Sequence, residues 1–286
     1  MKSKEEKHMD CTKQNYVDGK VIIITGASGG FGALTAERAA QMGGKIVLAA
    51  RNEDKLKAEV EKIHAAGGEA AYCVTDVTKR AEVYALAKFA VDTYGRIDVL
   101  VNNAGTMPLA FFKDHEKAMD AWENCIDLSL KGTLYGIAAV YDQMIAQGSG
   151  HIINVSSIYA NFPVPGAGVY QACKMGVKYL ADSLRDECQG KIRVSVIRPT
   201  GVPATGLMST VIDPMAGMYN IADPMEMDGL NKEMPGRPDL NNINNIKYIN
   251  FDPAIIADNI IFTINQPMGL CVSDITVRGS GDMYCL

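Results

Sequence analysis

Residues 20–42, "KVIIITGASGGFGALTAERAAQM", combine the patterns of a strand, a turn and a helix. The stretch opens with a short β-branched run, which is typical of a strand buried on both faces. A glycine-rich turn and a helical segment follow. Gly26, Gly30 and Gly32 permit a tight turn and let backbone N–H groups approach a diphosphate at the helix N-terminus. The alternative is that these glycines serve only the packing of helix on strand, but their place after a first strand favours a nucleotide site.

Strand and helix patterns alternate along the rest of the chain. Further strands are predicted at 45–50, 70–75, 97–103, 151–156, 191–197 and 271–277, and helices at 52–66, 81–94, about 114–147, about 168–189 and 253–264. Alternation of this kind predicts βαβ units, with right-handed crossovers and helices on both faces of a parallel sheet. The predicted class is therefore α/β, a single doubly wound domain with about seven parallel strands and ligands at their carboxyl ends.

Two segments depart from this alternation. Residues 1–18 are charged and polar, without the apolar stretch of a signal peptide, and we expect an N-terminal extension to a domain of residues 19–286. Residues from about 200 to 250 are rich in proline and methionine. A connection of this length inside a compact domain is usually functional or disordered, and its apolar content argues against disorder. We therefore expect a substrate-loop insertion there.

Composition and charge exclude several classes of function. The net charge is −5, and no clustered basic stripe suggests a nucleic-acid partner. No apolar run approaches the length of a membrane span. The seven cysteines and four histidines show no metal-motif spacing, so we expect no metal site. Reduced thiols are typical of a cytoplasmic protein, and we expect that location.

The end of the second predicted strand indicates which dinucleotide binds. An acidic residue there suits the ribose of NAD, whereas an arginine suits the 2′-phosphate of NADP. The sequence reads "LAARNEDKL", with Ala50 where the acid would stand and Arg51 after it. Glu53 and Asp54 fit the first turn of the next helix. NADP(H) is therefore the expected cofactor, and the alternative is that Arg51 is an ordinary surface side chain.

A second candidate site lies in "NVSSIYANFPVPGAGVYQACK", residues 154–174. Tyr170 and Lys174 are one helical turn apart, which places them on one face of a helix. Both are ordinary helix residues, and the pair alone favours that reading. A lysine beside a tyrosine can also lower the pKa of the phenol, so that it moves a proton near neutral pH.

Four patterns in order together resemble the short-chain dehydrogenase/reductase family from about residue 18 onward: "TGASGGFG", "NNAG" at 102–105, "NVSS" at 154–157 and Tyr170-x-x-x-Lys174. The resemblance implies a Rossmann-type domain. It implies that Tyr170 is the proton donor, that Lys174 lowers its pKa and binds the nicotinamide ribose, and that Ser157 holds the substrate oxygen. Asn102 would line the cofactor as well. The remaining residues expected to contact the cofactor are Gly26, Ser28, Gly30, Phe31, Gly32, Arg51, Asp76, Val77, Asn103, Ala104, Gly105, Pro199 and Val202.

The sequence departs from the family pattern at two places. Ser129, in "DLSLKG", stands where the family carries an asparagine that holds a water connecting the lysine to solvent. We expect Ser129 to take part in a rebuilt proton relay. The Pro-Gly that follows the sixth strand in the family reads Pro199-Thr200 here. That change leaves open the backbone path near the nicotinamide.

These observations predict an NADPH-dependent oxidoreductase that reduces a ketone to a secondary alcohol, or the reverse. Methionine adapts to irregular apolar surfaces, so the methionine-rich segment favours a bulky apolar substrate such as a steroid, bile acid or polyphenol. One alternative is a 3-oxoacyl thioester reductase. Another is an inactive NADP-sensing regulator, although such a protein need not keep both Tyr170 and Lys174. We expect a homodimer or homotetramer, with no nucleic-acid or membrane partner.

Overall fold

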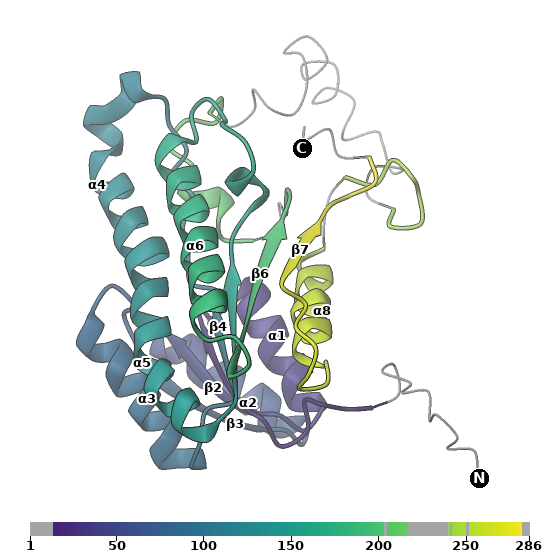
Figure 1. Ribbon diagram of the computed structural model, residues 1–286. Coiled ribbons are helices and arrows are strands. Elements are labelled where there is room, and N and C mark those ends of the chain that lie inside the picture. The colour runs from purple at the N-terminus through teal and green to yellow at the C-terminus, as the bar shows by residue number, and fades with distance from the viewer. Residues whose placement is uncertain (1–13, 203–204, 217–239, 241, 250–251, 282–286) are drawn as a thin grey trace, which may run out of the picture.

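The computed structural model describes residues 14–202, 205–216, 240, 242–249 and 252–281. Within these residues, seven strands form one sheet in the order β3-β2-β1-β4-β5-β6-β7 (Figure 1). Every neighbouring pair is parallel, which confirms the predicted sheet. The strands are β1 (Val21–Thr25), β2 (Lys45–Ala50), β3 (Glu69–Val74), β4 (Val99–Asn102), β5 (Gly150–Val155), β6 (Ile192–Pro199) and β7 (Asp274–Val277).

Helices cover both faces of the sheet because successive strand side chains point to opposite sides. Ile22 and Ile24 of β1 pack in one core with side chains of α1 (Gly30–Gln41), α2 (Glu53–Ala65) and α8 (Pro253–Ile264). Ile23, between them, packs in a second core with α3 (Arg80–Tyr94), α5 (Gly132–Gln147) and α6 (Gly168–Glu187). The first strand is therefore buried on both faces, as its unbroken β-branched run predicts.

The helical region predicted at about 114–147 is confirmed, but it is not one regular helix. It consists of α4 (His115–Cys125), a π-helical segment (Ile126–Lys131) and α5. A π turn contains an extra residue, so it changes the face on which the following side chains lie. Apolar periodicity does not specify such a turn, and the sequence analysis missed it.

Most strand boundaries differ from the sequence prediction by one or two residues, and two differences are informative. Val17 is fully buried in the first core, so the packed body begins before residue 19. The last strand begins at Asp274 rather than at residue 271. Residues 217–239 of the expected substrate-loop insertion lie outside the described residues. In the described part of the chain, no helix is both long and apolar enough to cross a membrane.

Candidate active site

A cleft of about 1540 Å³ lies along the carboxyl ends of the strands. Its walls come from the loops that follow β1, β2, β3, β4, β5 and β6, together with residues 205–216 and 240–249. This is where an open α/β sheet binds ligands. Among the predicted site residues, those that line the cleft are Gly26, Ser28, Gly30, Phe31, Arg51, Asp76, Val77, Asn103, Ala104, Gly105, Ser157, Tyr170, Lys174, Pro199 and Val202.

The glycine-rich turn forms one wall of the cleft and has little room for side chains. Gly26 has φ +67°, and a Cβ there would lie 2.9 Å from the Cα of Ala104. Gly32 does not line the cleft, but a Cβ on it would lie 2.6 Å from the carbonyl oxygen of Gly26. Gly32 therefore serves close packing of α1 under the turn. No side chain caps α1, which leaves N–H groups of its first turn for an anion.

The end of β2 brings a second basic side chain to the cleft beside Arg51. Asn52 caps α2 by accepting a hydrogen bond from the backbone N–H of Lys55 at 2.9 Å, and both residues line the cleft. Sequence reasoning missed Lys55, although its position one helical turn after Arg51 could have indicated it. Glu53 lies in the first turn of α2, as predicted, and forms an ion pair with Lys57 at 3.0 Å.

Asp76 lines the cleft in the loop after β3, the strand that pairs with β2. Burial alone would raise the pKa of Asp76, but hydrogen bonds from Thr78 and the positive charge of Arg51 lower it below its usual value. The Thr78 hydroxyl donates to the carboxylate at 2.8 Å and the Thr78 N–H at 3.0 Å. Asp76 is thus an ionised acceptor within the field of Arg51.

The two asparagines after β4 have different surroundings. Asn103 lines the cleft, and its side chain donates to the carbonyl oxygen of Thr25 at 3.0 Å. Asn102 does not line the cleft, which corrects the expectation that it lies along the cofactor. It is buried and donates to the side chain of Asn154 at 2.9 Å. Because Asn102 and Asn154 are paired residues of β4 and β5, this bond ties the two strands together.

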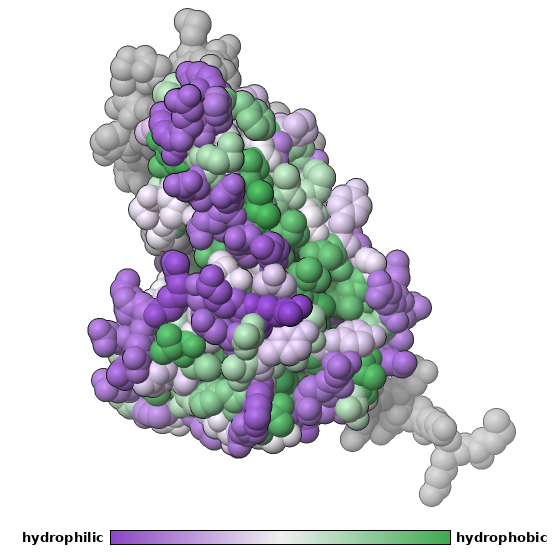
Figure 2. All heavy atoms as spheres, turned by 90° about the vertical axis from the view of Figure 1, so that its left-hand side faces the viewer, coloured by the Kyte–Doolittle hydropathy of each residue, from purple (hydrophilic) through white to green (hydrophobic). Residues whose placement is uncertain are grey.

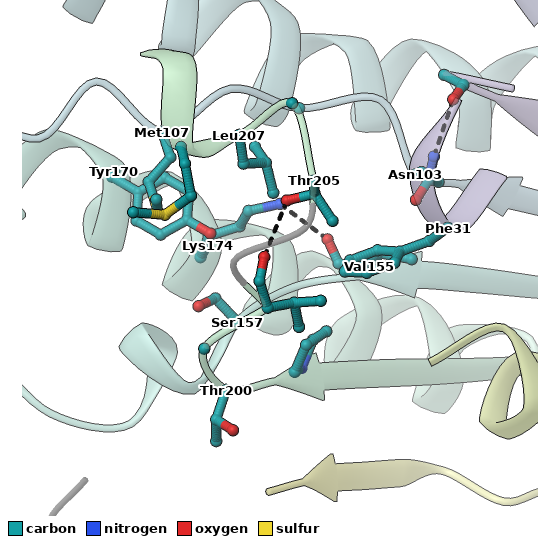
Figure 3. A pocket seen from close by; sticks show the side chains of 18 of the residues that line it. Phe31, Asn103, Met107, Val155, Ser157, Tyr170, Lys174, Thr200, Thr205 and Leu207 are labelled. Carbon is teal, nitrogen blue, oxygen red and sulfur yellow. Dashed lines mark hydrogen bonds between the residues drawn. The ribbon is translucent and has the colours of Figure 1, made fainter. Parts of the chain in front are cut away.

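Tyr170, Lys174 and Ser157 meet at the middle of the cleft. The ammonium of Lys174 lies 5.8 Å from the centre of the Tyr170 ring and donates a hydrogen bond to the carbonyl oxygen of Val155 at 2.9 Å. Figure 3 shows the Lys174 side chain beside the ring of Tyr170. Burial lowers the pKa of Lys174, while the nearby sulfurs of Cys125 and Cys173 raise it. A buried ammonium beside a phenol can hold a ligand hydroxyl and influence proton transfer.

The two serines after β5 make different hydrogen bonds. The hydroxyl of Ser156 donates to the carbonyl oxygen of Lys174 at 2.8 Å, which fixes α6 against the end of β5. The hydroxyl of Ser157 accepts from the N–H of Tyr159 at 3.2 Å and keeps its own proton to donate. This geometry favours Ser157 as the serine that contacts a substrate.

Tyr159 also orients the proton-donor candidate, a role that the sequence did not reveal. Its ring meets that of Tyr170 edge to face, with centroids 5.8 Å apart. Both side chains are buried, and Tyr159 lines the cleft as well. Edge-to-face aromatic contacts restrict ring orientation, so Tyr159 helps to fix where the Tyr170 hydroxyl lies.

Ser129 lies behind the wall of the cleft and does not line it. It is buried within the π-helical segment. A Cβ placed on Gly105 would lie 3.7 Å from the hydroxyl oxygen of Ser129 and 3.4 Å from the ammonium nitrogen of Lys174. The two polar groups therefore border one space next to Gly105. The role of Ser129 in a relay stays a prediction.

The end of the cleft beyond Tyr170 is largely apolar. Residues 205–216 contribute Leu207, Met208 and Val211, and the loop after β4 contributes Met107 and Leu109. The sequence indicated the methionine-rich segment but neither Met107 nor Leu109. The two segments are joined, because the N–H of Met107 donates to the hydroxyl of Thr210 at 2.9 Å.

Metal-ligating side chains do not gather near the cleft. Among the residues that the structure describes, no group of three His, Cys, Asp or Glu side chains could hold an ion.

Comparison with known proteins identifies the family. The family model described as short chain dehydrogenase matches residues 20–215. The chain belongs to the short-chain dehydrogenase/reductase family. It is an NAD(P)-dependent oxidoreductase, as the four sequence patterns predict. The uncharacterized oxidoreductase Lin0452 of Listeria innocua is 38% identical over 269 residues, covering 91% of this chain and 96% of its own.

Two solved structures of similar proteins support the same conclusion. A 7α-hydroxysteroid dehydrogenase complexed with NADH and 7-oxo glycochenodeoxycholic acid has a TM-score of 0.76 and 26% identity, covering 94% of this chain and 97% of its own. A metagenomic short-chain oxidoreductase in complex with NADP has a TM-score of 0.70 and 29% identity, covering 92% of this chain and 98% of its own.

Proposed function

We propose that this enzyme reduces a ketone on a bulky apolar substrate with NADPH, or catalyses the reverse oxidation. The observation that carries the proposal is that three groups of side chains follow one another along a single cleft. Arg51 and Lys55 lie at one end, Tyr170, Lys174 and Ser157 in the middle, and apolar side chains from residues 205–216 at the other end.

The residues at the first end fit an NADP molecule. The uncapped first turn of α1 and the glycine-rich turn would hold the diphosphate. Arg51 and Lys55 would bind the 2′-phosphate, because no acidic side chain replaces Ala50 at the end of β2. Asp76 would accept a hydrogen bond from the adenine. When bound, the nicotinamide supplies or accepts a hydride.

The side chains at the middle of the cleft would transfer a proton to or from the substrate oxygen. Ser157 would donate a hydrogen bond to the substrate oxygen and orient it. Tyr170 would give its phenolic proton to that oxygen as the carbonyl becomes an alcohol, and it would take the proton back in the oxidation. Lys174 would stabilise the phenolate that remains and bond the nicotinamide ribose. In the family these roles belong to the matching residues.

The apolar end supports a bulky substrate. Met107, Leu109, Leu207 and Met208 offer flexible and branched apolar surfaces. A steroid, bile acid or polyphenol ketone fits this chemistry, and the similar hydroxysteroid dehydrogenase was solved with a bile-acid ketone. Residues 217–239, expected to close over the substrate, lie outside the described residues.

Steady-state oxidation of NADPH and of NADH against steroid, bile-acid, flavonoid and acyl thioester ketones tests the proposal. We expect turnover of a bulky ketone with a preference for NADPH. Turnover of acyl thioesters alone would favour a 3-oxoacyl thioester reductase. Binding of NADPH without turnover of any ketone would favour a regulator, and a preference for NADH would overturn the cofactor assignment.

We also propose that the enzyme works in the cytoplasm as a homo-oligomer. Figure 2 shows hydrophobic side chains gathered on the face that is on the left-hand side of Figure 1. Ile126, Leu134, Met175 and Tyr179 are exposed on the π-helical segment, α5 and α6. Exposed apolar side chains on adjoining elements are typical of an interface. Light scattering of the purified protein would show the expected dimer or tetramer.

A further inference from the structure

The side chain of Thr210 joins two segments of the cleft without lining the cleft itself. Thr210 ends a short 3₁₀ helix, Met208–Thr210, and its neighbours Leu207 and Val211 both line the cleft. Its hydroxyl donates to the carbonyl oxygen of Leu207 at 2.6 Å and accepts from the N–H of Met107 at 2.9 Å. Because a hydroxyl has one proton and two lone pairs, this side chain closes its own turn and also bonds a segment 103 residues away in the sequence.

Two further hydrogen bonds hold the same two segments together. The backbone N–H groups of Ile212 and Asp213 donate to the carbonyl oxygen of Leu109, at 3.1 and 3.0 Å. Apolar packing adds to this contact, because Ala216 lies in one buried cluster with Leu109 and Tyr170. The first part of the connection between β6 and α8 is therefore bonded to the loop after β4, next to the candidate proton donor.

The loop after β4 is itself held in place by other elements. The N–H groups of Asn103 and Ala104 both donate to the hydroxyl of Thr25 at the end of β1, at 3.0 and 3.2 Å. Further along the loop, the carbonyl of Pro108 accepts from the buried indole of Trp122 at 3.0 Å. A segment whose backbone groups are bonded in this way opens rarely, so it can support whatever binds to it.

We infer that Thr210 is a positioning residue that fixes the apolar wall of the substrate end, formed by Leu207, Met208 and Val211, against the loop after β4. The wall then keeps its place while a substrate binds, and it does not close as a lid. A wall that is already in place favours binding, because less ordering entropy is lost on association. The inference rests on the proposed function for the meaning of the substrate end, but the hydrogen bond from Met107 to Thr210 can be tested without turnover.

Amide hydrogen exchange of the free enzyme measures this hydrogen bond. Thr210→Val keeps the shape of the side chain and removes its hydroxyl. The N–H of Met107 then loses its acceptor and should exchange about three- to tenfold faster, as expected for the loss of one net hydrogen bond. The N–H groups of Ile212 and Asp213 should also exchange faster, and Thr210→Ser should restore the wild-type rates.

Ser209→Ala is the matched control. Ser209 lies in the same 3₁₀ helix, is exposed, and donates within its own segment to the carbonyl oxygen of Gly206 at 2.7 Å. It should leave the exchange of Met107 unchanged. An unchanged rate at Met107 in Thr210→Val would overturn the inference. An equal acceleration in Ser209→Ala, or in the amides of β4, would also overturn it, because the loss would then not be confined to the contact of Thr210.

The Michaelis constants of a bulky and a small ketone connect this contact to substrate binding. In Thr210→Val, KM for the bulky ketone that the wild type reduces should rise about three- to tenfold with kcat nearly unchanged, because contacts made equally in the ground and transition states are weakened. KM for cyclohexanone, which carries no bulky substituent to bury against the apolar wall, should stay the same. Thr210→Ser should behave like the wild type.

Two outcomes separate this inference from the proposed function. A fall in kcat with both ketones would show a general effect on the fold and would overturn the positioning role of Thr210. If the wild type turns over no ketone, the proposed function fails, while the exchange rates still decide whether Thr210 fixes the wall.

Discussion

The two ends of the cleft are built in different ways. The cofactor end consists of the turns after β1, β2 and β3 together with Asn103, Ala104 and Gly105, all at the carboxyl ends of strands that pair within one sheet. The substrate end consists of residues 205–216 and 240–249, which belong to one long connection between β6 and α8. Strand ends fix positions closely, whereas long connections vary freely in length and composition. The cofactor end carries the family's motifs, and we expect the substrate end to carry the features that select this enzyme's substrate.

The largest loss of activity is expected from a substitution where the two ends of the cleft meet. Tyr170→Phe removes the phenolic proton but keeps the ring that packs edge to face on Tyr159. We expect kcat to fall by about 10²–10⁴-fold, the usual contribution of general acid–base catalysis, with the Kd of NADPH unchanged. Single-turnover kinetics and a fluorescence titration of NADPH measure the two quantities.

Tyr179→Phe is the control, because Tyr179 is 65% exposed on the same helix. Near-normal turnover of Tyr170→Phe would show that another group donates the proton.

Arg51→Ala is expected to weaken the binding of NADPH without affecting the substrate end of the cleft. Charge-assisted hydrogen bonds to a phosphate contribute about 1.5–3 kcal/mol, so the Kd of NADPH should rise about 10- to 100-fold. The Kd of NADH should not change, because NADH lacks the 2′-phosphate. Lys55→Ala should give a smaller loss in the same direction, since a lysine is a single point charge without the fork of an arginine.

Lys88→Ala is the comparison for both variants: Lys88 is an exposed cation that pairs with Asp92 on α3. An equal loss for NADPH and NADH in Arg51→Ala would mean that Arg51 supports the fold of this loop and does not recognise the 2′-phosphate.

The sequence predicts most of the residues that line the cofactor end of the cleft, because each of its parts has a local signature. The β-branched run of the first strand, the three glycines of the turn and the arginine after the second strand can each be recognised from a few consecutive residues. Tyr170 and Lys174 are readable because one helical turn separates them. Other residues of the site were missed because their contacts join different elements, such as Tyr159 on Tyr170 and Met107 on Thr210.

Helix geometry sets a further limit. Ser129 lies in the π turn at 126–131 and does not line the cleft, and no period of apolar residues predicts that turn. The position of Asn102 could not be predicted from the sequence either. Its side chain bonds Asn154 on the neighbouring strand, and this contact depends on the pairing of β4 with β5.

A moderate rise in KM is expected from a substitution at the substrate end of the cleft. Met208 lines the cleft and is 52% exposed in the free enzyme, so a bound apolar substrate would bury it further. Met208→Ala should raise KM for the bulky ketone by roughly three- to tenfold, since about 25 cal/mol per Å² of buried apolar surface is lost. The Kd of NADPH should stay the same.

Met215→Ala is the matched variant, because Met215 has a similar exposure of 58% but does not line the cleft. If both methionine variants raise KM alike, the effect comes from the loop as a whole and Met208 makes no specific contact with the substrate.

The smallest effect on activity, and a distinct effect on stability, is expected away from both ends. Glu59 of α2 and Glu37 of α1 lie together with Lys62, whose ammonium is 2.5 Å from Glu37 and 4.0 Å from Glu59. Burial and the charge of Glu37 raise the pKa of Glu59 to about 7, while Lys62 opposes the rise. The folded protein thus binds a proton on Glu59 more tightly than the unfolded chain, whose carboxyl has its ordinary pKa. The free energy of unfolding should therefore fall as the pH rises from about 4.5 to about 7.

Glu59→Gln removes this titration, because an amide cannot ionise beside Glu37. Above pH 7 the variant should be more stable than the wild type by about 1–3 kcal/mol, and at pH 5 the difference should shrink toward zero. Urea unfolding at a series of pH values measures both. Glu61→Gln, an exposed neighbour on the same helix, should reproduce none of this pH dependence. A constant offset between Glu59→Gln and the wild type across pH would mean that Glu59 is already ionised at pH 5. Unchanged kcat and KM in Glu59→Gln would show that the packing of α1 on α2 can be altered without disturbing either end of the cleft.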